Sequence, residues 1–194
     1  GDPAAPVIPA LAFLDTFSHR RQSLQLGKTV AVIGAGNTAM DAARSALRVP
    51  GVEKVTIVYR RSEKEMPAYR EEYELALADH IEFRFLLNPE SFAPGQLTCR
   101  VMKLGAPDGS GRRKPEPTAE AAILPVDTVI TAIGEDINRE LLQAIGADGS
   151  RPNVYVIGDA HHGPSSIVKA IADARRVADE ISGALYEMRV VPGC

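Results

Sequence analysis

A glycine-rich loop between a short apolar run and a helix-like segment constrains the fold more than any other feature of this chain. The loop reads Gly34-Ala35-Gly36-Asn37-Thr38-Ala39, after an apolar run at residues 29–33 and before a helical pattern at 40–48. A second apolar run, residues 55–59, completes a strand–helix–strand unit of about 30 residues. The bare pattern also occurs in ordinary loops, but this context favours a Rossmann-like parallel sheet that binds a dinucleotide.

Each residue of the loop has a separate expected role. Gly34 allows the tight turn after the strand, and Gly36 lets the backbone approach a pyrophosphate. Ala39 stands where a third glycine is usual and still permits close packing of helix on strand. Backbone N–H groups at the helix start supply positive potential for phosphates, and the side chains of Asn37 and Thr38 can add donors.

The end of the second strand indicates which nucleotide is bound. A carboxylate there favours the 2′-hydroxyl of NAD, whereas arginine favours the 2′-phosphate of NADP. Arg60 and Arg61 occupy that position, while Glu53 precedes the strand and belongs to the opposite edge of the sheet. We therefore expect an NADP(H) site, the alternative being a solvated strand end. Arg70 is a second candidate for the phosphate, or a surface residue of the next helix.

The rest of the first 134 residues follows an α/β pattern. The spacing predicts helices over 9–20 and 68–79, the latter with Tyr69, Tyr73, Ala76 and Leu77 inward. Alternation predicts a strand over 81–85, which Asn88-Pro89 should end. An antiparallel β-meander is expected from strands at 96–104 and 121–124, which flank an exposed turn at 105–117. A buried strand at 127–133 then ends at Gly134.

The last 60 residues contain a second motif. We expect a helix near 138–145, a strand at 154–157 that ends in Gly158-Asp159, and a long final helix. Its expected inward face consists of Ile167, Ala170, Ile171, Ala174, Ala178, Ile181 and Leu185. Asp159 can accept hydrogen bonds from flavin hydroxyls, and the helix start at Ser165, Ser166 and Ile167 can stabilise a reduced flavin. The alternative is a plain strand–loop–helix with a capping serine.

Composition and charge exclude several classes of function. The net charge of −3 argues against non-specific nucleic-acid binding, and no apolar run reaches membrane-spanning length. The two cysteines, Cys99 and Cys194, form no Cys-x-x-Cys pair, which suits a reducing cytoplasm. The adjacent His161 and His162 suggest a metal, but neighbouring residues rarely aim at one ion, so we expect no metal site.

The combination of motifs resembles the small (beta) subunit of glutamate synthase and related pyridine-nucleotide–disulfide-oxidoreductase-like flavoproteins. The resemblance is carried by residues 32–44, by Tyr59-Arg60-Arg61, by Met66-Pro67-Ala68, by residues 124–134 and by Gly158-Asp159. It implies an NADPH domain inserted in an FAD domain, with hydride passing from the nicotinamide to the flavin. It also implies cofactor-binding roles for Gly134 and Gly158, and a large catalytic subunit as a partner.

The expected organisation is that of a module from a larger flavoprotein. Residues 1–26 are interpreted as a linker and helix from the edge of the FAD domain, 27–134 as the NAD(P)-binding domain, and 135–194 as the C-terminal portion of the FAD-binding domain. The family's N-terminal iron–sulfur segment and first FAD-binding glycine loop have no counterpart in these 194 residues. Two alternatives remain open at this point, a non-catalytic nucleotide-binding or interaction domain and a thioredoxin-reductase-like reductase.

Overall fold

The computed structural model describes residues 7–107, 109, 113–134, 139–147, 150–163 and 165–190, with side chains described as far as Tyr186. The chain divides into two compact units, Gly1–Gly134 and Glu135–Cys194, and each is described by itself. Among the described residues, no helix is both long and apolar enough to cross a membrane.

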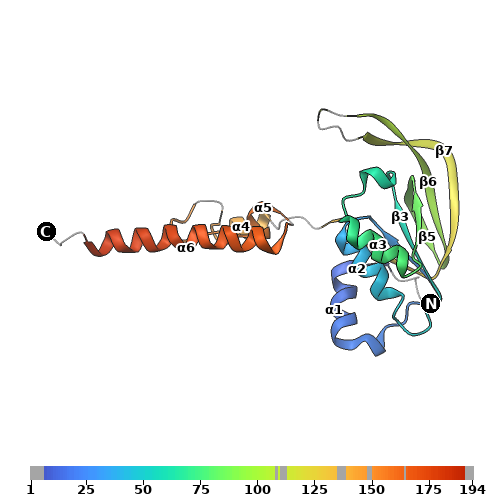
Figure 1. The fold of residues 1–194 in the computed structure, drawn as a ribbon, viewed down its shortest axis with the longest axis horizontal. Coiled ribbons are helices and arrows are strands. Elements are labelled where there is room, and N and C mark those ends of the chain that lie inside the picture. Colours follow the sequence, from blue (N-terminus) through green and yellow to red (C-terminus); the bar gives the residue numbers. More distant parts are fainter. Residues whose placement is uncertain are drawn as a thin grey trace. The chain divides into compact units, whose positions relative to one another are not determined.

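A five-stranded parallel sheet forms the centre of the first unit (Figure 1). Its strands, in spatial order, are β1 (Val7–Pro9), β8 (Thr128–Thr131), β2 (Thr29–Ile33), β3 (Lys54–Tyr59) and β4 (Glu82–Phe85). The predicted strand at 29–33 is confirmed, and the strands predicted at 55–59, 81–85 and 127–133 are confirmed with shifted bounds. The expected α/β class is therefore confirmed.

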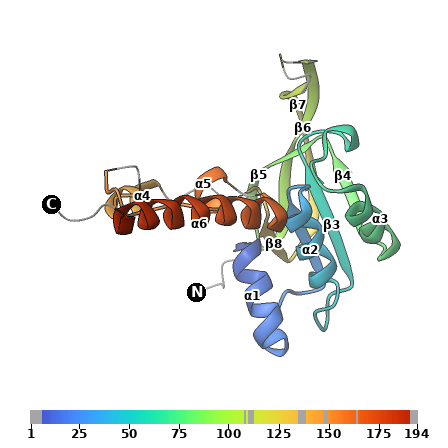
Figure 2. The ribbon, with the colours of Figure 1, turned by 60° about the vertical axis from the view of Figure 1, so that its left-hand side comes forward.

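Three helices cover one face of this sheet, and an antiparallel sheet covers the other (Figures 1 and 2). The helices are α1 (Ala10–Arg20), α2 (Asn37–Ala46) and α3 (Arg70–Ala78). Short 3₁₀ turns follow α1 at Arg21–Ser23 (η1) and precede α3 at Glu63–Glu65 (η2). In α3, Tyr73 and Ala76 are buried as predicted, but Tyr69 and Leu77 are exposed, because Tyr69 precedes the helix and Leu77 lies on its outer face.

Alternate residues of the central strands pack into two separate cores. Val32 and Ile57 face the helices together with Phe13 of α1, whereas Ile33 and Val58 face the antiparallel sheet. A strand buried on both faces must be apolar at every position, which is why the strand sequences read as continuous apolar runs.

The antiparallel sheet consists of β5 (Leu87–Ala93), β6 (Gly95–Pro107) and β7 (Arg113–Val126). The prediction that Asn88-Pro89 ends a strand was wrong, because Leu86 adopts a left-handed conformation (φ 57°) and the chain continues into edge strand β5. A proline is tolerated on an edge strand because the missing N–H is not needed by a second neighbour.

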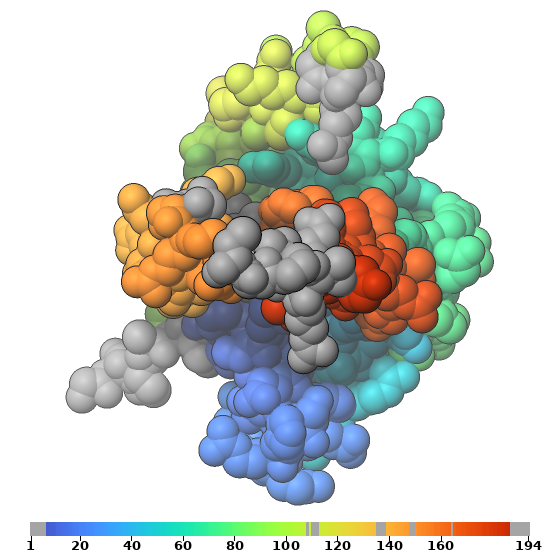
Figure 3. All heavy atoms as spheres, turned by 90° about the vertical axis from the view of Figure 1, so that its left-hand side faces the viewer, coloured from blue at the N-terminus to red at the C-terminus, as the bar shows by residue number. Residues whose placement is uncertain are grey.

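The exposed turn predicted at 105–117 is shorter than expected, because β6 extends to Pro107 and β7 begins at Arg113, so most of this segment is a two-stranded antiparallel ribbon. Arg113 of β7 links the two strands, because its guanidinium donates to the carbonyl oxygens of Leu104 (2.8 Å) and Gly105 (2.9 Å) in β6. In the space-filling view, this ribbon (yellow-green) and α1 (blue) lie at opposite ends of the first unit (Figure 3).

Residues 7–26 pack with the first unit. Strand β1 pairs with β8 through Val7, Ile8 and Pro9, and Phe13 of α1 is fully buried in the helix-side core. The assignment of residues 1–26 to the edge of an FAD domain stays a prediction, and residues 1–6 lie outside the described residues.

The second unit contains α4 (Arg139–Ala144), α5 (Asp159–His162) and α6 (Ile167–Val190). The strand predicted at 154–157 is not formed. A parallel strand needs a hydrogen-bonded neighbour, and the described part of this unit contains no other strand.

Helix α6 extends over the predicted segment, but its predicted inward face was only partly right: Ala170, Ala174 and Ile181 are half-buried, while other members of that face are exposed. The buried side chains are Asp173 and Val177, whereas Ile167, Ile171 and Leu185 are exposed. Periodicity identifies the apolar stripe of a helix but not the partner that covers it.

Candidate nucleotide-binding site

The candidate site lies at the carboxyl edge of the parallel sheet. Strand β2 continues through α2 to β3 on one side, while β8 pairs with β2 on the other side. Ligands of open α/β sheets bind at such a reversal of strand order. Gly34 follows β2, Arg60 follows β3 and Gly134 follows β8, so the fold brings these predicted residues to one edge.

Gly34 is a glycine because the fold demands it. Its φ of 129° is unfavourable for other residues, and an added Cβ would collide with the carbonyl oxygen of Ala132. Its N–H donates to the carbonyl oxygen of Val58 at 3.0 Å. Gly34 therefore joins the ends of β2, β3 and β8.

Gly36 is different, because no contact with the described residues requires a glycine there. It has an ordinary φ of −87° and ψ of 177°, and the nearest atom to an added Cβ would be Cγ of Pro67 at 4.0 Å. The absence of a side chain keeps the space in front of α2 open. This is the cradle that a pyrophosphate would fill.

The first turn of α2 faces that space with unsatisfied donors. The carbonyl oxygen of Gly36 accepts from the N–H groups of Ala39 (2.9 Å) and Met40 (3.2 Å), but no side chain caps the helix and its first turn contains no acidic residue. The N–H groups of Asn37 and Thr38 have no acceptor within the helix. Ala39 is fully buried, as its expected packing role requires.

Asn37 has a role that the sequence did not reveal. Its Oδ1 accepts a hydrogen bond from the backbone N–H of Tyr69 at 2.9 Å. The amide nitrogen of Asn37, the only donor of this side chain, is not used in this bond and stays free for the expected hydrogen bond to a phosphate. The backbone N–H of Ala68 donates to the carbonyl oxygen of Ala35 at 3.1 Å. The hydroxyl of Tyr59 donates to the backbone carbonyl oxygen of Glu65 at 2.8 Å. These three bonds fasten residues 65–69 beside the glycine loop, and we call this segment the clasp.

The two arginines after β3 remain available for a ligand. Arg60 is exposed and Arg61 is half-buried. The Nε of Arg61 is buried and has no hydrogen-bond acceptor among the described residues. An unpartnered guanidinium N–H is costly, and an anion could satisfy it only after the Arg61 side chain moves, because the protein covers this atom.

Arg70 is already engaged. Its Nε lies 2.8 Å from Oε1 of Glu74, and its NH1 lies 3.4 Å from Oε1 of Glu63. The guanidinium also lies 5.4 Å from the centre of the Tyr73 ring. Glu74 raises the pKa of Arg70, so a phosphate would have to compete with two carboxylates for this cation.

Gly134 completes this edge of the sheet. It has a φ of 105°, and an added Cβ would meet no atom of the described residues within 4 Å. The neighbouring Ile133 is 78% exposed. An exposed apolar side chain beside a glycine suits contact with a ring of a bound nucleotide.

In the second unit, two of the residues predicted to face a flavin, Asp159 and Ser165, form hydrogen bonds with each other. Oδ1 of Asp159 accepts from the Ser165 N–H (3.1 Å) and hydroxyl (3.0 Å). The Ser166 hydroxyl accepts from the N–H of Lys169 at 3.4 Å, and Ile167 is 80% exposed. One oxygen of Asp159 is thus used to shape the loop before α6.

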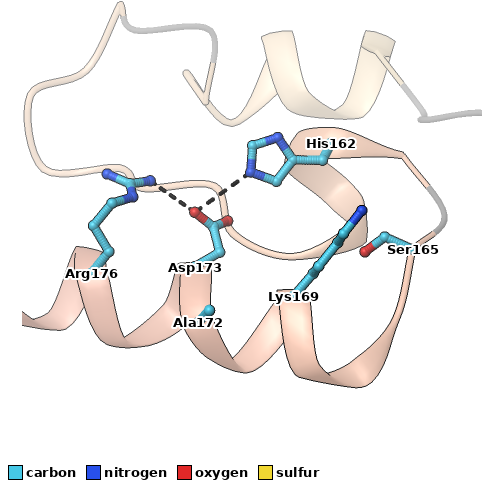
Figure 4. A pocket seen from close by; sticks show the side chains of 6 residues that line it. All are labelled: His162, Ser165, Lys169, Ala172, Asp173 and Arg176. Carbon is cyan, nitrogen blue, oxygen red and sulfur yellow. Dashed lines mark hydrogen bonds and ion pairs between the residues drawn. The ribbon is translucent and has the colours of Figure 1, made fainter.

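Sequence reasoning missed the central residue of this unit, Asp173. Gly158 N–H donates to its Oδ2 at 2.8 Å, and Nδ1 of His161 lies 3.4 Å from the same oxygen. Arg176 NH2 donates to its Oδ1 at 2.8 Å, and His162 faces that oxygen as well (Figure 4). Arg176 and the Gly158 N–H hold the pKa of Asp173 well below its usual range. Our premise that the adjacent histidines would not aim at one point was wrong. The only signal in the sequence was a carboxylate three residues before an arginine in an amphipathic helix.

The comparisons with known proteins assign the family. Residues 3–174 match the model of the pyridine nucleotide-disulphide oxidoreductases, and the chain belongs to this family. It is 54% identical over 190 residues to the putative oxidoreductase YgfK of Escherichia coli O157:H7, across 90% of this chain and 18% of that protein. It is 37% identical over 205 residues to the NADP(+)-dependent formate dehydrogenase subunit beta of Moorella thermoacetica, across 95% of this chain and 29% of that protein.

The resemblance to glutamate synthase is also confirmed. The chain is 34% identical over 181 residues to the glutamate synthase [NADPH] small chain of Escherichia coli K12, across 80% of this chain and 38% of that protein. The chain thus spans less than two-fifths of each of these three relatives. FprA from Mycobacterium tuberculosis, solved in complex with NADPH, has the same fold, with a TM-score of 0.69, 20% identity and coverage of 97% of this chain and 60% of FprA.

Proposed function

We propose that this chain binds NADP(H) and is the nicotinamide-nucleotide module of a flavin-dependent oxidoreductase. The observation that carries the proposal is the pairing of an open cradle at Gly36, in front of the uncapped start of α2, with two arginines at the end of β3. The cradle accommodates a pyrophosphate, and the arginines recognise a 2′-phosphate. Gly34, Asn37, Thr38, Ala39 and Gly134 shape or line the site, and Arg70 contributes only if it leaves its carboxylate partners.

Family membership supports the redox part of this proposal. FAD, where bound, supplies the acceptor for the hydride of NADPH. The residues proposed to contact the ribityl chain and the ring of a flavin are Gly158, Asp159, Ser165, Ser166 and Ile167. Asp159 offers a flavin only one free oxygen, because its Oδ1 already accepts hydrogen bonds from Ser165. In the longer relatives' architecture, these residues would complete a flavin site begun elsewhere, and residues 135–194 would be the C-terminal portion of the FAD lobe.

The thioredoxin-reductase alternative is disfavoured by the chemistry of Cys99. This thiol is buried among strand side chains of the antiparallel sheet, and burial raises its pKa to about 11. A thiol that stays protonated at neutral pH is a poor redox nucleophile. Cys194 lies outside the described residues.

Titration of the nucleotides tests the proposal. NADPH should bind the unmodified chain more tightly than NADH, and Arg60→Ala with Arg61→Ala should remove most of that preference. Charge-assisted hydrogen bonds contribute roughly 1.5–3 kcal/mol each, so the difference should reach about tenfold or more in Kd.

The matched control is Arg20→Ala with Arg21→Ala, another adjacent pair. Helix α1 runs back from the carboxyl edge of β1, so this pair lies at the opposite edge of the sheet and should not affect the preference. Equal affinities of the unmodified chain for NADPH and NADH would refute the assignment of the arginines.

A further inference from the structure

Three side chains of the second unit converge on one point. His161 and His162 come from α5 and Asp173 from α6, and their ligand atoms all lie within 4.8 Å of one another. Nδ1 of His161 is 3.4 Å from Oδ2 of Asp173, and Nε2 of His162 is 3.6 Å from its Oδ1. Ligands held at about 2.0–2.2 Å around a tetrahedral ion lie roughly 3.4 Å apart. Each nitrogen–oxygen separation is close to that spacing, and because the two nitrogens approach different oxygens of one carboxylate, small side-chain movements would bring all three residues onto one ion.

Asp173 is oriented as a metal-binding carboxylate should be. Its side chain is only 5% exposed, and the N–H of Gly158 and the guanidinium of Arg176 each donate to one of its oxygens at 2.8 Å. Each oxygen keeps a second lone pair. Hydrogen-bonded carboxylates of this kind are usual in metal sites, where outer donors fix the ligand.

The site is open to solvent and selective in its chemistry. The side chains of His161 and His162 are 45% and 55% exposed, and a pocket of about 620 Å³ lined by His162, Asp173 and Arg176 gives an ion and its water room to enter (Figure 4). Lys169 also lines the pocket. The positive charges of Lys169 and Arg176 repel cations, so a cation that is attracted by charge alone, without coordination by imidazole, would not bind here. Imidazole nitrogens suit Zn²⁺, whereas Mg²⁺ and Ca²⁺ prefer oxygen ligands.

We propose that His161, His162 and Asp173 bind one Zn²⁺ ion, with water as the fourth ligand. The ion would link α5 to α6. It would thereby fix the turn at Gly158 and Asp159. Asp159 begins α5, and the N–H of Gly158 already donates to Asp173 of α6.

Equilibrium dialysis against Zn²⁺ tests the proposal, because the chain offers a matched control. It contains four histidines, and the other two are His19 and His80. The unmodified chain and the variant His19→Ala with His80→Asn should each bind one Zn²⁺, asparagine being chosen because His80 has a φ of 61°. His161→Ala with His162→Ala should weaken binding by roughly 100-fold or more, since even outer-shell changes cost 10–100-fold.

Two further readouts separate ligation from structure. X-ray absorption of the bound ion should show nitrogen and oxygen neighbours and no sulfur. Zn²⁺ should raise the thermal unfolding midpoint of the unmodified chain but not that of the variant lacking His161 and His162, whose midpoint without metal should be unchanged because both side chains are half-exposed. Equal Zn²⁺ binding by the two double variants, or no binding by the unmodified chain, would overturn the proposal.

Discussion

Oδ1 of Asn37, in the first turn of α2, accepts a hydrogen bond from the backbone N–H of Tyr69 at 2.9 Å. The bond joins the glycine loop to the clasp at residues 65–69, whose Pro67 is the nearest neighbour of the Gly36 cradle. Asn37 thus positions one wall of the proposed site. A variant at position 37 that still accepts from the Tyr69 N–H but carries a negative charge separates the positioning role of this side chain from phosphate binding.

We expect Asn37→Asp to keep the melting temperature, because aspartate also accepts from Tyr69 and a negative charge suits a helix N-terminus. It should nevertheless weaken NADPH binding several-fold through repulsion of the pyrophosphate. Asn37→Ala should lose stability of about 1 kcal/mol, the usual contribution of one hydrogen bond. Calorimetric melting and NADPH titration check both, and an aspartate variant that binds as tightly as the unmodified chain would contradict the location of the pyrophosphate.

The two glycines of the loop should respond in opposite ways to substitution. Gly36→Val should abolish NADPH binding and leave the unfolding midpoint nearly unchanged, because the nearest described atom to an added Cβ is Cγ of Pro67 at 4.0 Å and the φ of Gly36 is ordinary for any residue. Gly34→Ala should instead destabilise the fold by several kcal/mol, because a Cβ meets the Ala132 carbonyl at a φ of 129°. Urea denaturation measures both effects. Undiminished NADPH binding by a folded Gly36→Val variant would show that the site lies elsewhere.

The limits of prediction from sequence follow from what each residue contacts. Strand β2 was predicted with its observed bounds because both faces of a central parallel strand are buried, which leaves a continuous apolar run. The strand predicted at 154–157 was wrong, because an apolar run does not show whether a partner strand exists to pair with it. The roles of Asn37 and Asp173 depend on backbone N–H groups 32 and 15 residues away, which no local pattern encodes.

The amino edge of the sheet contains a carboxylate that should make stability depend on pH. Oδ2 of Asp127 accepts from the Lys28 N–H (2.8 Å), the Thr29 N–H (2.9 Å) and the Thr29 hydroxyl (3.0 Å). The Thr29 N–H, followed by the other donors, lowers the pKa of Asp127. A lowered pKa means that the stabilisation is fully present above the unfolded-state pKa of about 3.9 and is lost as pH falls through the lower folded-state pKa.

Asp127→Asn should therefore reduce stability at pH 7 by about 1–2 kcal/mol, since hydrogen bonds to a charged acceptor are stronger than neutral ones. The difference from the unmodified chain should shrink below about pH 4. Urea unfolding at a series of pH values measures it. A difference that stays constant from pH 7 to pH 3 would exclude the ionised carboxylate as its source.

The last prediction concerns flavin. Asp159 and the residues before α6 offer part of a flavin site, but Oδ1 of Asp159 is engaged by Ser165, and the one Gly-x-Gly-x-x-Ala loop of these 194 residues belongs to the proposed NADPH site. A flavin without a glycine loop for its own pyrophosphate lacks several backbone N–H contacts, each of about 1 kcal/mol. We therefore expect the purified chain to be colourless, and added FAD to separate from it on gel filtration, as absorbance at the flavin band would show. A longer polypeptide that supplies a second glycine loop should retain FAD and reduce a dye with NADPH, whereas FAD held in equal amount by the 194-residue chain would prove the prediction wrong.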